Sequence, residues 1–305
     1  MDPLSLGYSP CPNDTYIFNA LVHRLIPYAG PELAPPVLDD VETLNAWAMQ
    51  GRFDITKLSC HAYGYLRDQY RVLSAGAALG RGCGPLLVTH HGDKAADPAG
   101  WRVAIPGRYT TAALLLQLYL PGCTTTVMRF DRIMDALEQQ SVDAGLIIHE
   151  GRFTYRDRDL LCVQDLGEWW ERETGFPIPL GCIAMKSGLG QDLHDAVSVG
   201  IVQSIRWAEA HPDACLSYIR AHAQELAPGV IQSHIDLYVN SFSKDLGPEG
   251  LAAIDELIRR GQAIGLLPVV QACRAGRPFR QIPAGPVQPA RRSRHSIPAL
   301  CSASA

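Results

Sequence analysis

A histidine that follows a wholly apolar run is the residue of this sequence best suited to proton transfer. His149 comes directly after Leu146-Ile147-Ile148 and before Glu150. The run belongs to a predicted strand over 143–148, so His149 is expected at the carboxyl end of that strand. An imidazole that faces a cleft there has a near-neutral pKa suited to general-base or general-acid work. The alternative is a histidine with a purely structural role.

Two adjacent threonines open a predicted helix and could hold an anion. Thr110 and Thr111 follow Pro106-Gly107-Arg108-Tyr109 and precede an apolar stretch that ends at Tyr119. Hydroxyls and free backbone N–H groups at a helix N-terminus suit a carboxylate or phosphate, and the helix dipole adds to the attraction. An ordinary helix N-cap is the alternative for both residues.

A lysine and a serine end another apolar strand, predicted over 53–58. A lysine such as Lys57 has no packing reason to be there unless its stem snorkels to the surface. Lys57 and Ser59 therefore either bind a ligand or lie at a strand end from which the lysine side chain reaches the surface.

In the turn over 9–14 we expect Asn13 and Asp14 to cap the helix that follows, and Cys11 to be a small buried packing residue.

The two halves of the chain repeat one pattern of elements. Aligning Asp54 with Asp143 places Cys60 opposite His149. Few identities accompany the alignment, so two ordinary βαβ units would also explain it. The elements of the first half are a strand over 4–8, helices over 15–23 and 41–50, and a strand over 53–58. The elements of the second half are a strand over 102–105, a helix over 110–119, a strand over 125–130, a helix over 131–140 and a strand over 143–148.

Ligands of open α/β sheets bind beyond the carboxyl ends of the strands. Four segments meet that description, two from each half: 9–15, 57–59, 106–111 and 149–150. Strand candidates also lie at 71–73 and 84–89, and the polar stretch 92–98 is typical of a hinge loop.

The order of elements predicts that the chain crosses twice between two lobes. A strand over 180–185 returns from the second half, and helices over 193–210, 212–222, 228–240 and 248–264 follow it. We therefore expect a discontinuous first lobe, residues 1–92 plus 180–275, and a second lobe of residues 93–179. Residues 276–305, rich in Pro, Arg, Ser and Ala, are expected to form a disordered tail.

Charge, cysteine spacing and histidine spacing argue against nucleic-acid partners, disulfides and metal sites. The net charge of −4, from 27 Lys+Arg against 31 Asp+Glu, argues against a nucleic-acid partner. The nine cysteines show no C-x-x-C spacing, which argues against zinc and against disulfides. The other histidines lack the spacing of a metal site, and His222 and His234 are expected at the surface.

Targeting and cofactor signals are missing from the sequence. The N-terminus lacks the features of a secretory signal, and the longest apolar stretch, 112–120, is too short to span a membrane, so we expect a cytoplasmic protein without membrane insertion. No G-x-G-x-x-G follows a strand, and no G-x-x-x-x-G-K-[ST] or G-x-S-x-G occurs. We therefore expect neither a nucleotide cofactor nor serine hydrolysis.

Taken together, four motifs resemble those of the 1,4-dihydroxy-6-naphthoate synthases, the cyclic dehypoxanthine futalosine lyases of the futalosine route to menaquinone. The resemblance runs from about Leu4 to Leu266. The motifs are Ser9-Pro10-Cys11-Pro12-Asn13-Asp14-Thr15, Thr56-Lys57-Leu58-Ser59, Pro106-Gly107-Arg108 with Thr110-Thr111, and Ile147-Ile148-His149-Glu150.

The resemblance implies an α/β fold similar to type II periplasmic solute-binding proteins, with two lobes joined by a two-strand hinge. It implies that Lys57, Leu58 and Ser59, with Thr110 and Thr111, bind a small anionic substrate. It implies that His149 is the proton acceptor of a carbon–carbon lyase that needs no cofactor and no metal. The alternative is a two-lobed binding protein or sensor for a small carboxylate, and the oligomeric state stays open.

Overall fold

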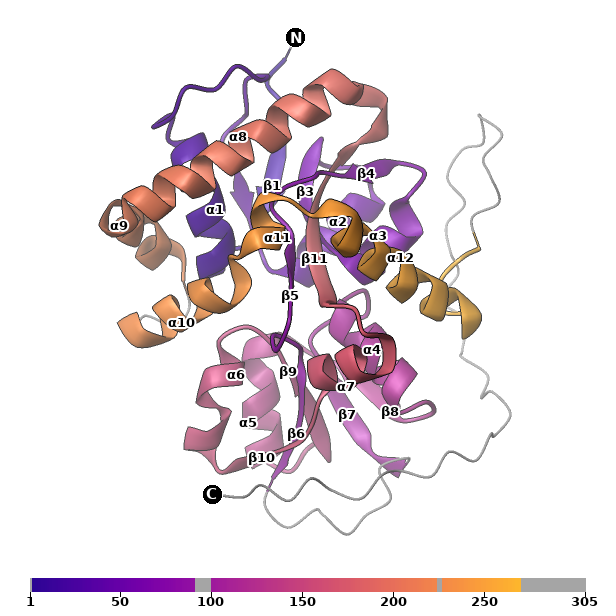
Figure 1. Ribbon diagram of the computed structural model, residues 1–305. Helices are drawn as coiled ribbons and strands as arrows, with labels where there is room; N and C mark the ends of the chain where they lie inside the picture. The colour runs from indigo at the N-terminus through magenta and orange to yellow at the C-terminus, as the bar shows by residue number, and fades with distance from the viewer. Residues whose placement is uncertain (1, 91–99, 224–226, 270–305) are drawn as a thin grey trace.

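The computed structural model describes residues 2–90, 100–223 and 227–269, which form two α/β lobes, each built on its own mixed sheet (Figure 1). The first sheet has the strand order β2-β1-β3-β11-β4, and β5 also pairs with β11. Its strands are β1 (Leu6–Tyr8), β2 (Val37–Leu38), β3 (Ile55–Ser59), β4 (Tyr70–Val72), β5 (Ala78–Gly80) and β11 (Ile178–Lys186).

The second sheet has the order β10-β6-β9-β7-β8. Its strands are β6 (Leu86–His90), β7 (Arg102–Ile105), β8 (Thr124–Val127), β9 (Ala144–Ile147) and β10 (Leu160–Asp165). In each sheet a central strand runs parallel to two neighbours: β1 between β2 and β3, and β7 between β8 and β9. In each sheet an antiparallel strand pairs with one of these parallel neighbours: β11 pairs with β3, and β6 pairs with β9. This shared topology confirms the repeat predicted from the sequence.

Helices cover the faces of the two sheets. The long helix α8 packs along α1 on one face of the first sheet, and α3 and α12 cover its other face (Figure 1). The helices are α1 (Pro12–Val22), α2 (Val41–Met49), α3 (Cys60–Leu66), α4 (Thr111–Tyr119), α5 (Ile133–Glu138), α6 (Gly151–Thr154), α7 (Leu166–Thr174), α8 (Gln191–Ala210), α9 (Pro212–His222), α10 (Pro228–Tyr238), α11 (Ser241–Lys244) and α12 (Gly247–Ala263). Within the described ranges, no helix is long and apolar enough to cross a membrane.

The chain passes between the lobes twice, once from β5 to β6 and once from α7 to β11. The first passage packs against the start of α7: a Cβ atom on Gly84 would lie 2.2 Å from the backbone nitrogen of Gly167, so only glycine allows this approach. Arg152 also holds the first passage, because its guanidinium donates to the carbonyl oxygens of Gly84 (2.6 Å) and Gly82 (2.8 Å).

Several elements differ from the sequence prediction. The strand β6 belongs to the second sheet, where β9 and β10 are its partners, whereas the expected boundary at residue 92 placed it with the first lobe. The expected helix over 131–140 is a 3₁₀ turn (Phe130–Arg132) followed by α5. Helix α3 and strand β5 were not predicted from the sequence. The predicted loop over 92–98 lies within the undescribed range 91–99, and the predicted tail over 276–305 also lies outside the described residues.

Candidate functional site

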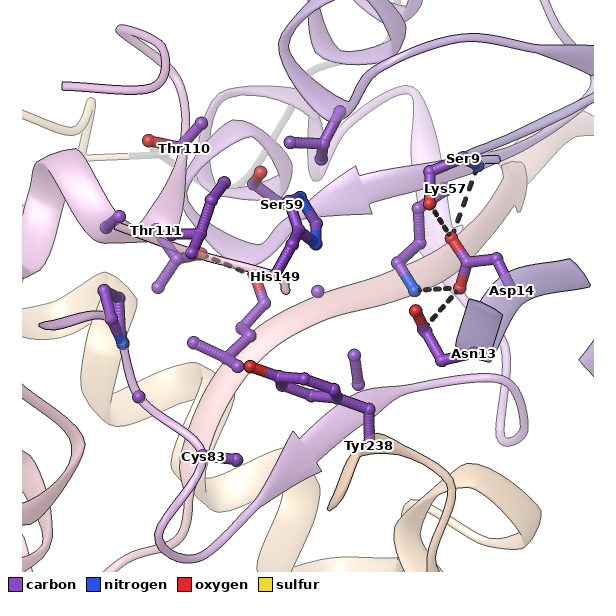
Figure 2. A pocket seen from close by; sticks show the side chains of 18 of the residues that line it. Ser9, Asn13, Asp14, Lys57, Ser59, Cys83, Thr110, Thr111, His149 and Tyr238 are labelled. Atoms are coloured by element: carbon purple, nitrogen blue, oxygen red, sulfur yellow. Dashed lines mark hydrogen bonds and ion pairs between the residues drawn. The ribbon is translucent and has the colours of Figure 1, made fainter. Parts of the chain in front are cut away.

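A cleft between the lobes brings together most of the residues selected from the sequence. It encloses about 660 Å³ of space between atoms, part of it open to solvent. Four polar segments line it, as expected for the carboxyl ends of the strands. Its polar lining is Ser9, Asn13, Asp14, Lys57 and Ser59 from the first lobe, Thr110, Thr111 and His149 from the second, and His234 and Tyr238 from α10 (Figure 2).

A buried ion pair occupies the first-lobe side of the cleft. The ammonium group of Lys57 lies 2.6 Å from a carboxylate oxygen of Asp14, and both side chains are almost fully buried. Asp14 also accepts hydrogen bonds from the hydroxyl of Ser9 (2.7 Å) and the amide of Asn13 (2.8 Å) (Figure 2). The cation of Lys57 is thus paired and held in place, so of the two alternatives for Lys57 the one in which its stem snorkels to the surface is wrong.

The prediction that Asn13 and Asp14 cap the first helix is also wrong. The N-cap position of α1 is Cys11, without a side-chain cap, and Pro12 is the first helical residue. Because proline has no N–H to be satisfied, this start needs less capping. Asn13 and Asp14 are therefore free to form the polar cluster with Lys57.

Ser59 is positioned by an amide in the neighbouring helix. The side chain of Asn45, in α2, donates to the hydroxyl of Ser59 at 3.0 Å and accepts from its backbone N–H at 2.9 Å. Leu58, by contrast, is fully buried in the hydrophobic core and does not line the cleft with its side chain.

Both threonine hydroxyls are engaged within the protein. Thr110 is the N-cap of α4, accepting from the backbone N–H of Ala113 at 3.2 Å, so the capping alternative is correct for it. Thr111 donates to the carbonyl oxygen of Leu180 at 2.7 Å, across the lobe boundary. Apart from the N–H of Ala113, which Thr110 caps, the backbone N–H groups of the first turn have no acceptor inside the helix. This turn, which includes the cleft-lining Ala112, therefore presents N–H groups and a positive dipole end to the cleft.

His149 follows β9 in a left-handed backbone conformation, with φ of 55°. Its Nδ1 lies 3.4 Å from the sulfur of Cys11, which leaves Nε2 as the nitrogen available to a ligand. The ring of Phe130 packs edge-on against the imidazole, with centroids 5.1 Å apart. Left-handed conformations are uncommon for residues other than glycine, and they concentrate at functional sites.

The environment of His149 favours the neutral imidazole. Burial lowers the pKa of His149 below its usual value, and Lys57 acts in the same direction. The negative charges of Glu150 and Asp14 oppose this shift in the pKa. Burial also raises the pKa of the Cys11 thiol well above its usual value, so the thiol stays protonated beside the imidazole. A neutral histidine is the form that accepts a proton.

Two cleft residues on α10 escaped the sequence analysis. The prediction that His234 lies at the surface is wrong, since only 1% of the residue is exposed. Its ring lies 6.2 Å from that of His149 and 4.6 Å from that of Tyr238, centroid to centroid. The amphipathic pattern of the helix places both residues on its buried face, one turn apart, and that spacing was the available signal. His222, the other histidine expected at the surface, is half-buried at the end of α9.

The chain is similar throughout its described length to proteins with assigned names. A family model described as menaquinone biosynthesis matches residues 4–263. A 1,4-dihydroxy-6-naphthoate synthase of Thermus thermophilus is 50% identical over 266 residues, which cover 87% of this chain and 96% of the relative. A synthase of the same name from Streptomyces coelicolor is 43% identical over 279 residues, 88% and 96% of the two chains. The resemblance drawn from the four motifs is confirmed.

Solved structures share the two-lobed architecture. A crystal structure of a protein from Archaeoglobus fulgidus has a TM-score of 0.81 and 35% identity, covering 87% of this chain and 98% of its own. The alkanesulfonate-binding protein of Xanthomonas axonopodis has a TM-score of 0.65 at 15% identity, covering 88% and 94%. The expected periplasmic-binding-protein-like fold is therefore confirmed.

Proposed function

Because the chain belongs to the menaquinone biosynthesis family, we propose that it is a carbon–carbon lyase that converts cyclic dehypoxanthine futalosine to 1,4-dihydroxy-6-naphthoate. The observation that carries this proposal is the 50% identity to a named synthase across 96% of that relative's length. A cleft between two lobes that is lined by His149 is consistent with an enzyme of this kind.

In this proposal, His149 starts the reaction as a general base. Its neutral imidazole takes a proton from a carbon next to a carbonyl group of the substrate, and the electron pair moves onto the carbonyl oxygen. Cleavage of a carbon–carbon bond then expels the sugar-derived fragment and leaves the aromatic naphthoate. The position of Nδ1 beside Cys11 supports Nε2 as the proton-accepting atom.

The anionic end of the substrate is assigned to the first turn of α4. Because the hydroxyls of Thr110 and Thr111 are already engaged, the backbone N–H groups of this turn are the donors we assign to the carboxylate. Ser59 and Lys57 face the same cleft from the other lobe. They would contact the polar oxygens of the sugar-derived part, with Lys57 kept in place by Asp14.

The rival function is that of a binding protein or sensor, which the same fold also supports. The two are separated by incubating the purified protein with cyclic dehypoxanthine futalosine and following the naphthoate chromophore. Formation of the naphthoate over multiple turnovers would establish lyase activity. Tight binding of the compound without product would overturn this proposal and favour the rival.

A further inference from the structure

The buried histidine of α10 is not explained by the requirements of the fold. Neither ring nitrogen of His234 has a hydrogen-bond partner among the described residues. The other two largely buried histidines of the described ranges each use one ring nitrogen: His61 lies 3.1 Å from the carbonyl oxygen of Thr110, and His194 lies 3.1 Å from that of Lys186. A buried polar group without a partner destabilises a protein, so packing alone would favour an apolar residue at position 234.

The surroundings of His234 connect it to the proposed base. Its side chain lines the cleft, and its ring lies nearly parallel to that of His149, at an interplanar angle of 23°. The ring of Tyr238 packs against it from the next turn of α10. An unsatisfied donor at the cleft wall beside the base is placed to reach a group of the bound substrate.

We propose that His234 is a second catalytic residue, a neutral imidazole whose N–H donates a hydrogen bond to the substrate oxygen that becomes negatively charged when His149 removes the proton. This inference rests on the proposed lyase function. In this step the C–H bond breaks, its proton goes to His149, and its electron pair forms the enolate whose oxygen accepts from His234. No oxidant or reductant takes part.

The charge state of His234 agrees with this role. Burial lowers the pKa of His234 well below its usual value, and the charges of protonated His149 and of Lys57 lower this pKa further. His234 therefore stays neutral when the base becomes protonated. A preorganised neutral donor stabilises a developing oxyanion strongly in a site shielded from water.

The test compares two replacements of His234 with a matched control. His234→Leu removes the N–H donor, and His234→Gln replaces it with an amide donor. His194→Gln alters a histidine that is equally buried but lies away from the cleft. Each variant is assayed for kcat and KM with cyclic dehypoxanthine futalosine, and for thermal unfolding.

We expect His234→Leu to lower kcat by roughly 10²- to 10³-fold, as for loss of one oxyanion donor, with KM within a few-fold of wild type. His234→Gln should recover part of that loss, and His194→Gln should leave kcat unchanged. The melting temperature of His234→Leu should equal or exceed that of wild type, because an unsatisfied polar group is removed.

Near-normal kcat in His234→Leu would overturn the inference, as would an equal loss in the Leu and Gln variants or an effect confined to KM. A wild-type protein that forms no naphthoate would instead overturn the proposed function, and this inference with it. The activity of the wild-type protein therefore distinguishes failure of the proposed lyase function from failure of the role assigned to His234.

Discussion

The pKa of His149 is set by opposing influences that the structure identifies. Burial and Lys57 lower the pKa, whereas Glu150 and Asp14 raise it. Since the base must be neutral, the proposed activity should be lost as the pH falls through this lowered pKa. The acid limb of the kcat/KM profile should therefore lie below pH 6.5, and activity should be constant around neutral pH.

Replacing Glu150 with glutamine should move this acid limb. Removal of the negative charge takes away an influence that raises the pKa of His149, so the limb should shift to lower pH. A pH–rate profile of kcat/KM measures the shift, with Asp157→Asn, an exposed acid on the same lobe, as the control. A limb that stays in place, or moves to higher pH, would contradict the assigned electrostatics.

The sequence identified His149, Lys57, Ser59, Thr110 and Thr111 as cleft residues, because each lies at the end of an apolar strand or at the start of a helix. Their partners could not be identified in the same way. The Lys57–Asp14 pair joins residues 43 positions apart, and only the folded sheet brings them within contact distance.

The junction of α3 and α4 joins the two lobes through a buried histidine. His61 is 5% exposed, and its Nδ1 lies 3.1 Å from the carbonyl oxygen of Thr110, which makes Nδ1 the donor. Burial lowers the pKa of His61 from 6.5 to about 4. The folded protein therefore resists a protonation that the unfolded chain accepts.

This shift has a definite consequence for stability. Above pH 6.5 the histidine is neutral in both states, and its contribution to the unfolding free energy is fully present. As the pH falls from 6.5 to about 4, the unfolded chain alone gains the proton, and roughly 3 kcal/mol of stability is lost. Below that range the folded protein also binds the proton, and the loss stops.

Replacement of His61 by asparagine should flatten this dependence, because the amide can still donate to Thr110 but does not titrate. Denaturant unfolding of wild type and variant at several pH values measures the difference. His211→Asn, which alters an exposed histidine, should keep the wild-type slope. Equal slopes for wild type and His61→Asn would contradict the assignment.

Some elements were beyond sequence reasoning for identifiable reasons. The strand β5 has only three residues and pairs with the distant β11, so no alternating pattern can develop. The helix α3 begins directly after β3, and its buried residues continue the apolar run of the strand. The prediction of a strand over 102–105 was correct, because a polar residue and a turn bound it clearly.

The two lobes are also clasped by a single carboxylate in this structure. Glu42, in the first turn of α2, accepts from the backbone N–H groups of Arg108 (2.7 Å) and Tyr109 (3.1 Å) in the second lobe. A Cβ atom on Gly107 would come within 2.5 Å of this carboxylate, so glycine is required for the approach. The repeat and the double crossing could be predicted from the sequence, whereas this clasp could not.

Loss of the clasp should weaken ligand binding. Glu42→Ala leaves two backbone donors without a charged acceptor, and hydrogen bonds to charged groups contribute about 1.5–3 kcal/mol. We expect the affinity for 1,4-dihydroxy-6-naphthoate to fall roughly tenfold or more, measured by equilibrium titration. Glu209→Ala breaks only an exposed ion pair with Lys244 and should have little effect. Unchanged affinity in Glu42→Ala would show that the clasp does not stabilise the arrangement of the lobes that binds the product.

The turnover of His149→Asn is the decisive test of whether His149 is the proton acceptor of a two-lobed lyase. Asparagine keeps a polar side chain but cannot accept the proton. We expect kcat for cyclic dehypoxanthine futalosine to fall by roughly 10²-fold or more, with product affinity close to that of wild type. Near-normal turnover in His149→Asn would contradict the claim.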